Sequence, residues 1–156
     1  MLLKRSLIVS CPIAMGRSRI KILALTELGK FVLGIEEPEA DRLGGPEHRY
    51  WKMSLAEHLR ASGYVVTEEY PVGGGKTIDL VAERDGKRIA FEVETGKSDA
   101  AANVQKCLKT GVDKVIVVAT ADAVKNSLSS MLSEYPSVMC LTGPEAMNRQ
   151  ASAALP

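Results

Sequence analysis

Hydrophobic and polar residues alternate with a period of two in two neighbouring runs, residues 77–84 and residues 87–94. Such alternation is typical of β-strands whose two faces meet different surroundings. Asp85 and Gly86 separate the runs, and Asp-Gly between two strand-like runs is a strong signal for a two-residue hairpin loop. The pattern therefore predicts an antiparallel β-hairpin from residue 77 to residue 94.

The short loop fixes which residues of this hairpin face each other. Arg84 pairs with Lys87, and continuing the register places Asp79 opposite Glu92. The pleat places Ile78, Leu80, Ala82, Ile89, Phe91 and Val93 on a core side, and Asp79, Val81, Glu92 and Glu94 on the other side. Because opposed like charges destabilise a sheet, we expect a bound cation or a raised pKa at this pair, and Mg²⁺ suits carboxylate oxygens. The alternative is that a bulge shifts the register and these are solvated surface acids.

Helical and strand-like patterns alternate along the rest of the chain. Further strands are expected at residues 7–13, 18–25, 64–70, 114–120 and 137–141, and helices at 26–34, 46–62, 98–110, 121–132 and from 143 onward. We expect Thr26 and Ser98 to be N-caps and Gly34 to end the first helix. The buried helix stripes are expected to be Trp51, Leu55, His58, Leu59 and Ser62, and Ala101, Val104, Cys107 and Leu108. Residues 114–120 are continuously apolar, which indicates a strand buried on both faces and parallel to residues 87–94. The order from Pro46 is α-β-β-β-α-β-α-β, an α/β fold with a mixed central sheet flanked by helices.

Composition is that of a folded soluble protein. The 156 residues are 46% hydrophobic and 25% charged, and no apolar run approaches the roughly 20 residues that cross a bilayer. The three cysteines are widely spaced, which suits neither a disulfide framework nor a zinc site and favours a cytoplasmic location. The acidic stretch at 36–46, rich in Gly and Pro, predicts a division into a basic hairpin and helix extension with its linker, 1–44, and an α/β domain, 45–156.

Charge is unevenly distributed although the net charge is only +1. Residues 1–34 hold six basic side chains and one acidic one, whereas residues 35–47 hold five acidic and one basic. A polyanion would therefore be bound through local clusters rather than through the field of the whole protein. Arg17 and Arg19 in the basic segment are candidates for contacts to a DNA backbone, as is Lys76 beside the hairpin. An ordinary solvated basic surface is the alternative.

The central motifs resemble those of the PD-(D/E)xK nuclease superfamily over roughly Gly45 to Thr120. IDLVA carries Asp79 and FEVETGK carries Glu92. The amino-acid sequence around them is most similar to that of archaeal Holliday-junction resolvases and related DNA endonucleases. The resemblance implies a restriction-endonuclease-like fold and a DNA endonuclease that depends on Mg²⁺ or Mn²⁺, acts on duplex or branched DNA and leaves a 5′-phosphate. It implies that Asp79, Glu92 and the backbone carbonyl of Val93 hold the metal.

The motif departs from the family at its lysine, because Glu94 stands two residues after Glu92 where the family usually has Lys. Glu94 is then a candidate metal ligand or a group that positions a water. Lys97, just past the strand, is a candidate replacement whose flexible stem would return an ammonium to the site, where it would orient hydroxide or stabilise the developing phosphorane. The alternative for Lys97 is a solvated loop residue.

Two helices offer further candidates. Family members often place polar or basic residues on the helix that follows the motif, and Asn103 and Lys106 are neighbours on one flank of that helix. Gln105 and Lys109 lie on its other flank, and only one flank can face the site. Resolvase-like members also use a Glu from the first core helix, for which Glu47 is the candidate. The alternative for Glu47 is an acidic residue that stabilises the positive end of the helix.

Rival motifs are excluded by spacing. GGGKT and ETGKS end like a P-loop but lack its first glycine, so no nucleotide cofactor is expected, and His48 and His58 are too far apart for a zinc helix. The segment GRSRIKILALTELGKFVLG is weakly similar to the wing and following helix of a winged helix-turn-helix, without its recognition helix. It is a remnant, an added hairpin or a homodimer contact. The functional alternatives to a nuclease are a nuclease-fold protein that binds DNA or a partner without cutting, and a DNA-binding regulator.

Overall fold

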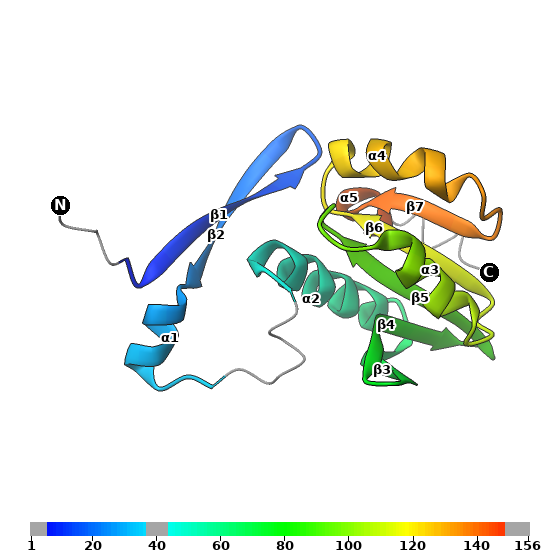
Figure 1. The fold of residues 1–156 in the computed structure, drawn as a ribbon, viewed down its shortest axis with the longest axis horizontal. Coiled ribbons are helices and arrows are strands. Elements are labelled where there is room, and N and C mark those ends of the chain that lie inside the picture. The colour runs from blue at the N-terminus through cyan, green and yellow to red at the C-terminus, as the bar shows by residue number, and fades with distance from the viewer. Residues whose placement is uncertain (1–5, 37–43, 149–156) are drawn as a thin grey trace.

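The computed structural model describes residues 6–36 and 44–148 as a five-stranded mixed sheet with helices on both faces, plus a two-stranded hairpin (Figure 1). The elements are β1 Ile8–Met15, β2 Ser18–Leu25, α1 Glu27–Leu33, α2 Pro46–Ala61, β3 Val65–Gly73, β4 Lys76–Arg84, β5 Lys87–Glu94, α3 Ala100–Leu108, β6 Lys114–Ala119, α4 Asp122–Leu132, β7 Val138–Thr142 and α5 Gly143–Ala146. The sheet order is β3-β4-β5-β6-β7, antiparallel through β5 and parallel from β5 to β7. The predicted α/β fold is confirmed.

Helices bury both faces of the sheet. On one face α2 inserts Trp51, Leu55 and Leu59 into a cluster with residues of β4, β5 and β6. On the other face Val104 of α3 packs on Val117 of β6, together with residues of α4. Each fully buried side chain of this size contributes about 1.5–3 kcal/mol. Because helices cover both faces, acidic side chains of β5 that point away from α2 lie under α3 rather than in open solvent.

The hairpin from β4 to β5 has the predicted register. Its pairing runs from Arg84–Lys87 to Leu80–Phe91, and both turn residues, Asp85 and Gly86, have positive φ as the tight turn requires. The alternative of solvated surface acids is wrong for β5, because Glu92 is 3% exposed and Glu94 1% exposed.

The predicted alternation fails at Ile78, which does not share the face of Leu80. Ile78 packs instead with Val81 and Ala90, beneath Cys107 of α3. The cause is a local irregularity around Asp79. Pairing of β4 with β3 passes from Glu68–Leu80 to Tyr70–Ile78, and Glu69 between them has a φ of 47°. The register of β3 and β4 is the same on both sides of this irregularity, so no extra residue is inserted there, and the register shift between these strands lies further along, between Pro71 and Gly73.

Helix ends show one expectation confirmed and one corrected. At α1 the Thr26 side chain accepts from Gly29 N, and Gly34 ends the helix in the left-handed conformation, as predicted. At α3 the N-cap is Asp99, whose carboxylate accepts from Ala102 N, rather than Ser98. The helix is therefore shorter than 98–110, and its buried stripe includes Ala100 while Leu108 is partly exposed.

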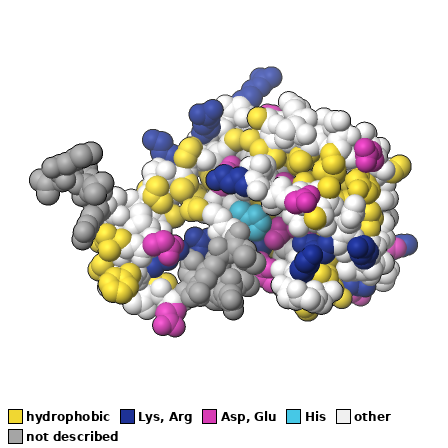
Figure 2. Space-filling view, in the orientation of Figure 1, with side chains coloured by type: hydrophobic (Ala, Val, Ile, Leu, Met, Phe, Trp, Pro, Cys, Tyr) yellow, Lys and Arg dark blue, Asp and Glu magenta, His cyan; other side chains and the backbone are white. Residues whose placement is uncertain are grey.

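The N-terminal hairpin shares the core of the α/β unit. Ile13 of β1 is fully buried in the same cluster as Trp51, and Met15 and Ile22 pack against that cluster. The hairpin and α1 expose hydrophobic side chains, among them Leu23 and Phe31. Figure 2 shows hydrophobic side chains gathered over this part of the molecule. Among the helices at residues 6–36 and 44–148, none is long and apolar enough to cross a membrane.

Candidate active site

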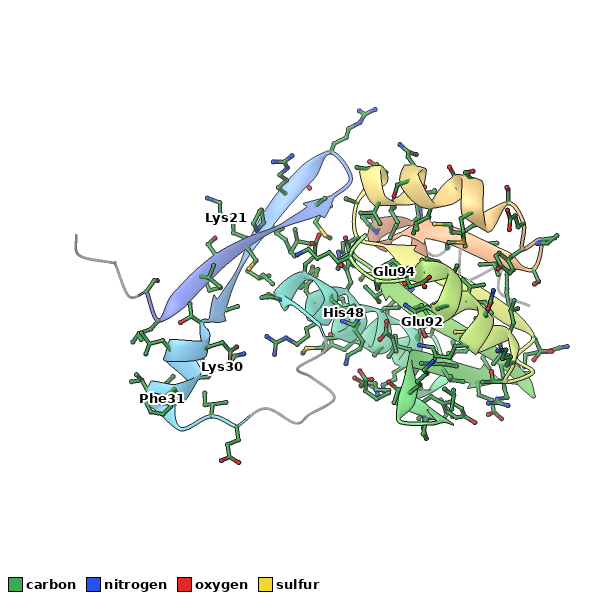
Figure 3. All side chains as sticks on the ribbon, in the orientation of Figure 1. Lys21, Lys30, Phe31, His48, Glu92 and Glu94 are labelled. Atoms are coloured by element: carbon green, nitrogen blue, oxygen red, sulfur yellow. The ribbon has the colours of Figure 1, made fainter. Side chains whose placement is uncertain are left out.

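A cavity of about 480 Å³ lies between the start of α2, the strands β4 and β5, and α3. Its charged lining comprises five basic residues, Arg49, Lys52, Lys76, Lys97 and Lys106, and three acidic residues, Glu69, Asp79 and Glu92. Figure 3 shows His48 on α2 lying near Glu92 on β5, with Glu94 further along that strand. The cavity therefore combines buried acids with an excess of positive charge, in a protein whose net charge is only +1.

Asp79 is held from two directions. The backbone N–H of Val93 donates to Asp79 Oδ2 at 2.8 Å, and Nε2 of His48 lies 3.0 Å from the same oxygen. The backbone pairing of β4 with β5 runs as far as Leu80–Phe91. Past that pair, the Val93 N–H of β5 donates to the side chain of Asp79 on β4. This contact fixes the Asp79 carboxylate at the cavity wall instead of leaving it to rotate in solvent.

His48 on α2 is the side chain that contacts the Asp79 carboxylate. Burial lowers the pKa of His48, but the hydrogen bond to Asp79 and the charge of Asp79 outweigh burial, so its pKa lies above the ordinary value. The other ring nitrogen, Nδ1, is buried without a partner in the described part of the chain. It lies against Gly44, where an added Cβ would collide with it. Gly44 therefore leaves the room that the imidazole needs to reach Asp79.

Glu92 is buried between Asp79 and α3. Lys106 Nζ lies 2.9 Å from Glu92 Oε1, and the Cys107 thiol donates to the same oxygen at 3.4 Å. Burial, and after it the charge of Asp79, raise the pKa of Glu92 to about 7, against the opposing effects of Lys106 and Cys107. Burial likewise raises the pKa of the Cys107 thiol. The electrostatic repulsion expected of opposed carboxylates is thus present, and Lys106 relieves only part of it.

Glu94 organises the segment between β5 and α3. Its carboxylate accepts from Ser98 Oγ and, at 2.8 Å, from Asn103 Nδ2. Asn103 Oδ1 in turn accepts from Lys106 Nζ at 3.3 Å. Glu94 thereby fixes the amide that helps to aim Lys106 at the cavity. Ser98, expected as a helix cap, instead serves this carboxylate.

The structure brings most of the predicted site residues to one cavity. Asp79, Glu92, Val93, Lys97, Lys76, Asn103 and Lys106 all line it. Gln105, on the opposite flank of α3, donates to Tyr135 instead, so the flank of Asn103 and Lys106 is the one that faces the cavity. Four candidates stand outside the described lining: Glu94 beneath it, Glu47 on α2, and Arg17 and Arg19, which are exposed at the turn of the N-terminal hairpin.

Sequence reasoning missed two residues of α2. His48 lines the cavity where Glu47 was expected, and Lys52 lines it one helical turn later. The spacing rule for a zinc helix relates His48 only to His58, so it carries no information about a carboxylate on another strand. The spacing of four residues between His48 and Lys52, next to the stripe of Trp51 and Leu55, was the signal for a polar row facing the site.

Comparison with known proteins assigns no function to this site. No family model and no curated protein matches the chain. Four chains of solved structure match it. One of them, described as the protein of unknown function AF1548, is 17% identical, with a TM-score of 0.44, and the match covers 68% of this chain and 67% of that one.

Proposed function

We propose that this protein is a metal-dependent DNA endonuclease of the PD-(D/E)xK kind, which hydrolyses phosphodiester bonds in duplex or branched DNA. The observation that carries the proposal is the meeting of Asp79 and Glu92 in one cavity whose remaining charged lining is mostly basic. The acids suit a divalent cation, and the basic residues suit phosphates. Neither an uncharged ligand nor a purely cationic one accounts for both halves of the lining.

The donor set fits Mg²⁺ or Mn²⁺. Within residues 6–36 and 44–148 no group of three or more His, Cys, Asp or Glu side chains is arranged to hold a metal, which argues against zinc. Magnesium needs fewer protein ligands, because it is bound through one or two carboxylates together with waters and phosphate oxygens. Asp79 and Glu92, with the carbonyl of Val93, would hold it. When bound, such an ion lowers the pKa of water and stabilises charge on a phosphate.

Lys106 takes over the role expected of the missing lysine. Its ammonium contacts Glu92 from α3, and Asn103 supports it, so it presents a positive charge beside the acids. There it would orient an attacking hydroxide and stabilise charge that develops on the phosphoryl oxygens. Lys97, at the cavity rim, offers a second ammonium to the same phosphate. Glu94 is a positioning residue in this scheme, because its carboxylate is buried under Ser98 and Asn103.

The test compares isosteric variants with a matched control. Asp79→Asn and Glu92→Gln are incubated with supercoiled, branched and single-stranded DNA in Mg²⁺ or Mn²⁺, beside Glu83→Gln, which changes an exposed acid of the same hairpin. Cleavage should fall at least about 100-fold in the first two and stay unchanged in the control, as expected when charge stabilisation at the reacting phosphate is lost. Equal cleavage by all four proteins, or none by the wild type, would overturn the proposal.

A second candidate function rests on Glu94, which occupies the position where the family usually has lysine. A nuclease-fold protein that binds DNA without cutting it would explain that exchange. Titration calorimetry separates the two functions. Uptake of Mn²⁺ by the wild type that Asp79→Asn abolishes favours the nuclease, whereas DNA binding by a folded protein that takes up no metal favours the binding protein.

A further inference from the structure

Lys52 is a lysine withdrawn almost completely from solvent. It lies one helical turn beyond His48 on α2, and its residue is 4% exposed. Its ammonium lies 2.5 Å from Oε1 of Glu69 on β3. A buried charge persists only with a partner, and Glu69 is a carboxylate partner that supports the charge of Lys52 at this depth.

Glu69 reaches Lys52 from an unfavourable backbone conformation. Its φ of 47° lies in the left-handed region, which side chains other than glycine rarely adopt. Its second carboxylate oxygen, Oε2, accepts from Thr77 Oγ1 at 2.8 Å. This backbone conformation lets the Glu69 side chain reach both Lys52 and Thr77, and strained residues of this kind cluster at functional sites.

Two cavities meet at Lys52 and Arg49. Both residues line the cavity that holds Asp79 and Glu92, and both also line a second cavity of about 470 Å³. The second cavity is completed by Met53, Glu57, Arg60 and Glu68 on the outer side of α2 and β3. Lys52 and Arg49 are therefore the basic residues that the two cavities share.

We propose that Lys52 forms a phosphate-binding subsite for the continuation of the phosphodiester chain, and that Glu69 occupies its ammonium until a phosphate replaces it. The proposal rests on the proposed function, because the ligand is the backbone of the same nucleic acid. Lysine binds phosphate as a compact point charge, so the subsite recognises backbone rather than base. Glu69 plays the part of a competing internal anion, which keeps the ammonium aimed at the cavity in the absence of DNA.

The opposite roles of the two residues make the subsite testable by binding alone. Anisotropy of a fluorescein-labelled 30-base-pair duplex in EDTA measures Kd without metal and without cleavage, over a series of salt concentrations. The proteins are the wild type, Lys52→Met, Glu69→Gln and Lys52→Arg. Lys125→Met is the matched control, since Lys125 pairs with Glu145 at 2.6 Å outside both cavities. Circular dichroism checks that each variant folds.

Lys52→Met should raise Kd about tenfold and reduce the salt slope by about one, because one phosphate contact is lost. Glu69→Gln should lower Kd several-fold because residue 69 no longer competes with phosphate as a carboxylate, and Lys52→Arg and Lys125→Met should bind like the wild type. A merely structural ion pair predicts lower melting temperatures for both partners' variants and no tightening by Glu69→Gln. That result would overturn the subsite, and so would a Kd for Lys52→Met within twofold of the wild type. If Lys52→Met does not fold, the sign of the change in Glu69→Gln decides.

Failure of the subsite and failure of the nuclease are distinguishable. DNA that is bound and cleaved by the wild type, with Kd unchanged in Lys52→Met and Glu69→Gln, refutes the subsite alone. A wild type that does not bind the duplex in EDTA or in Mg²⁺ refutes the proposed function and the subsite with it.

Discussion

Replacing Glu92 with glutamine should stabilise the metal-free protein at alkaline pH. Glu92 is buried and faces the charge of Asp79, and both raise its pKa to about 7 from an ordinary 4.5. Between these two values the folded protein keeps a proton that the unfolded chain has lost. The stability of the wild type therefore falls as pH rises through this window and levels off above the folded pKa. Glutamine resembles the protonated acid and carries no such dependence.

The size of the effect follows from the two pKa values. At 1.36 kcal/mol for each unit of pKa, raising the value from 4.5 to about 7 corresponds to about 3 kcal/mol lost by the wild type at pH 8. For a chain of this length that is a difference in melting temperature of about 6–12 °C. Lys106 loses an ionic partner in the variant but retains Asn103, which reduces the gain without reversing its sign.

Thermal and urea unfolding in EDTA from pH 4 to pH 9 measure this difference. The wild type and Glu92→Gln should have similar stability near pH 4 and diverge above pH 5, with the variant more stable. Added Mg²⁺ should then raise the melting temperature of the wild type at pH 8 more than that of the variant. Parallel pH profiles, or a variant that melts at or below the wild type at pH 8, would show that burial and Asp79 do not act on Glu92 as described.

Two further predictions concern how the site and the N-terminal hairpin are held. Gly44→Ala should push the His48 imidazole away from the Asp79 carboxylate and lower the pKa of His48 measured by NMR. Gly45→Ala, whose Cβ would meet nothing within 4 Å, should leave that pKa unchanged. Equal pKa values in both variants would show that Gly44 does not set the ring position. Ile13→Ala should cost about 2–5 kcal/mol in the free energy of unfolding because Ile13 is 0% exposed, whereas Leu23→Ala at a 74% exposed position of the same hairpin should cost little; equal losses would show that the hairpin is not anchored as described.

The fold was accessible from sequence where local chemistry fixes geometry. Asp85-Gly86 dictates one turn, and that turn dictates the register of β4 and β5. The continuous apolar run of β6 likewise identifies a strand buried under helices on both faces. Thr26 and Gly34 mark their helix because the Thr26 side chain accepts a hydrogen bond from Gly29 N and Gly34 adopts the left-handed conformation that glycine tolerates.

Contacts between different elements decide the features that local sequence does not predict. Asp99 and Ser98 are both good N-caps. Ser98 is not the cap because its hydroxyl donates a hydrogen bond to the buried carboxylate of Glu94 on β5. Ile78 changes face where the ladder between β3 and β4 is irregular around Glu69 and Asp79, and counting residues in twos along one strand cannot include such an irregularity. His48 reaches the site because α2, which begins after a glycine pair, packs against the strands of the sheet. The spacing of His48 and Lys52 indicates a polar row on α2, but it does not tell which strand carries the carboxylate that His48 meets.

The hydrogen bond from Val93 to Asp79 gives the sheet a built-in reporter. Most amide protons of a central strand sense only the carbonyl of the next strand, whereas this one ends on an ionisable carboxylate in the cavity wall. Its resonance frequency and its exchange with solvent deuterium therefore depend on the charge that Asp79 carries and on whatever shares that oxygen. A single backbone proton thus makes events in the cavity visible in a spectrum of the unmodified protein, without a label at the site.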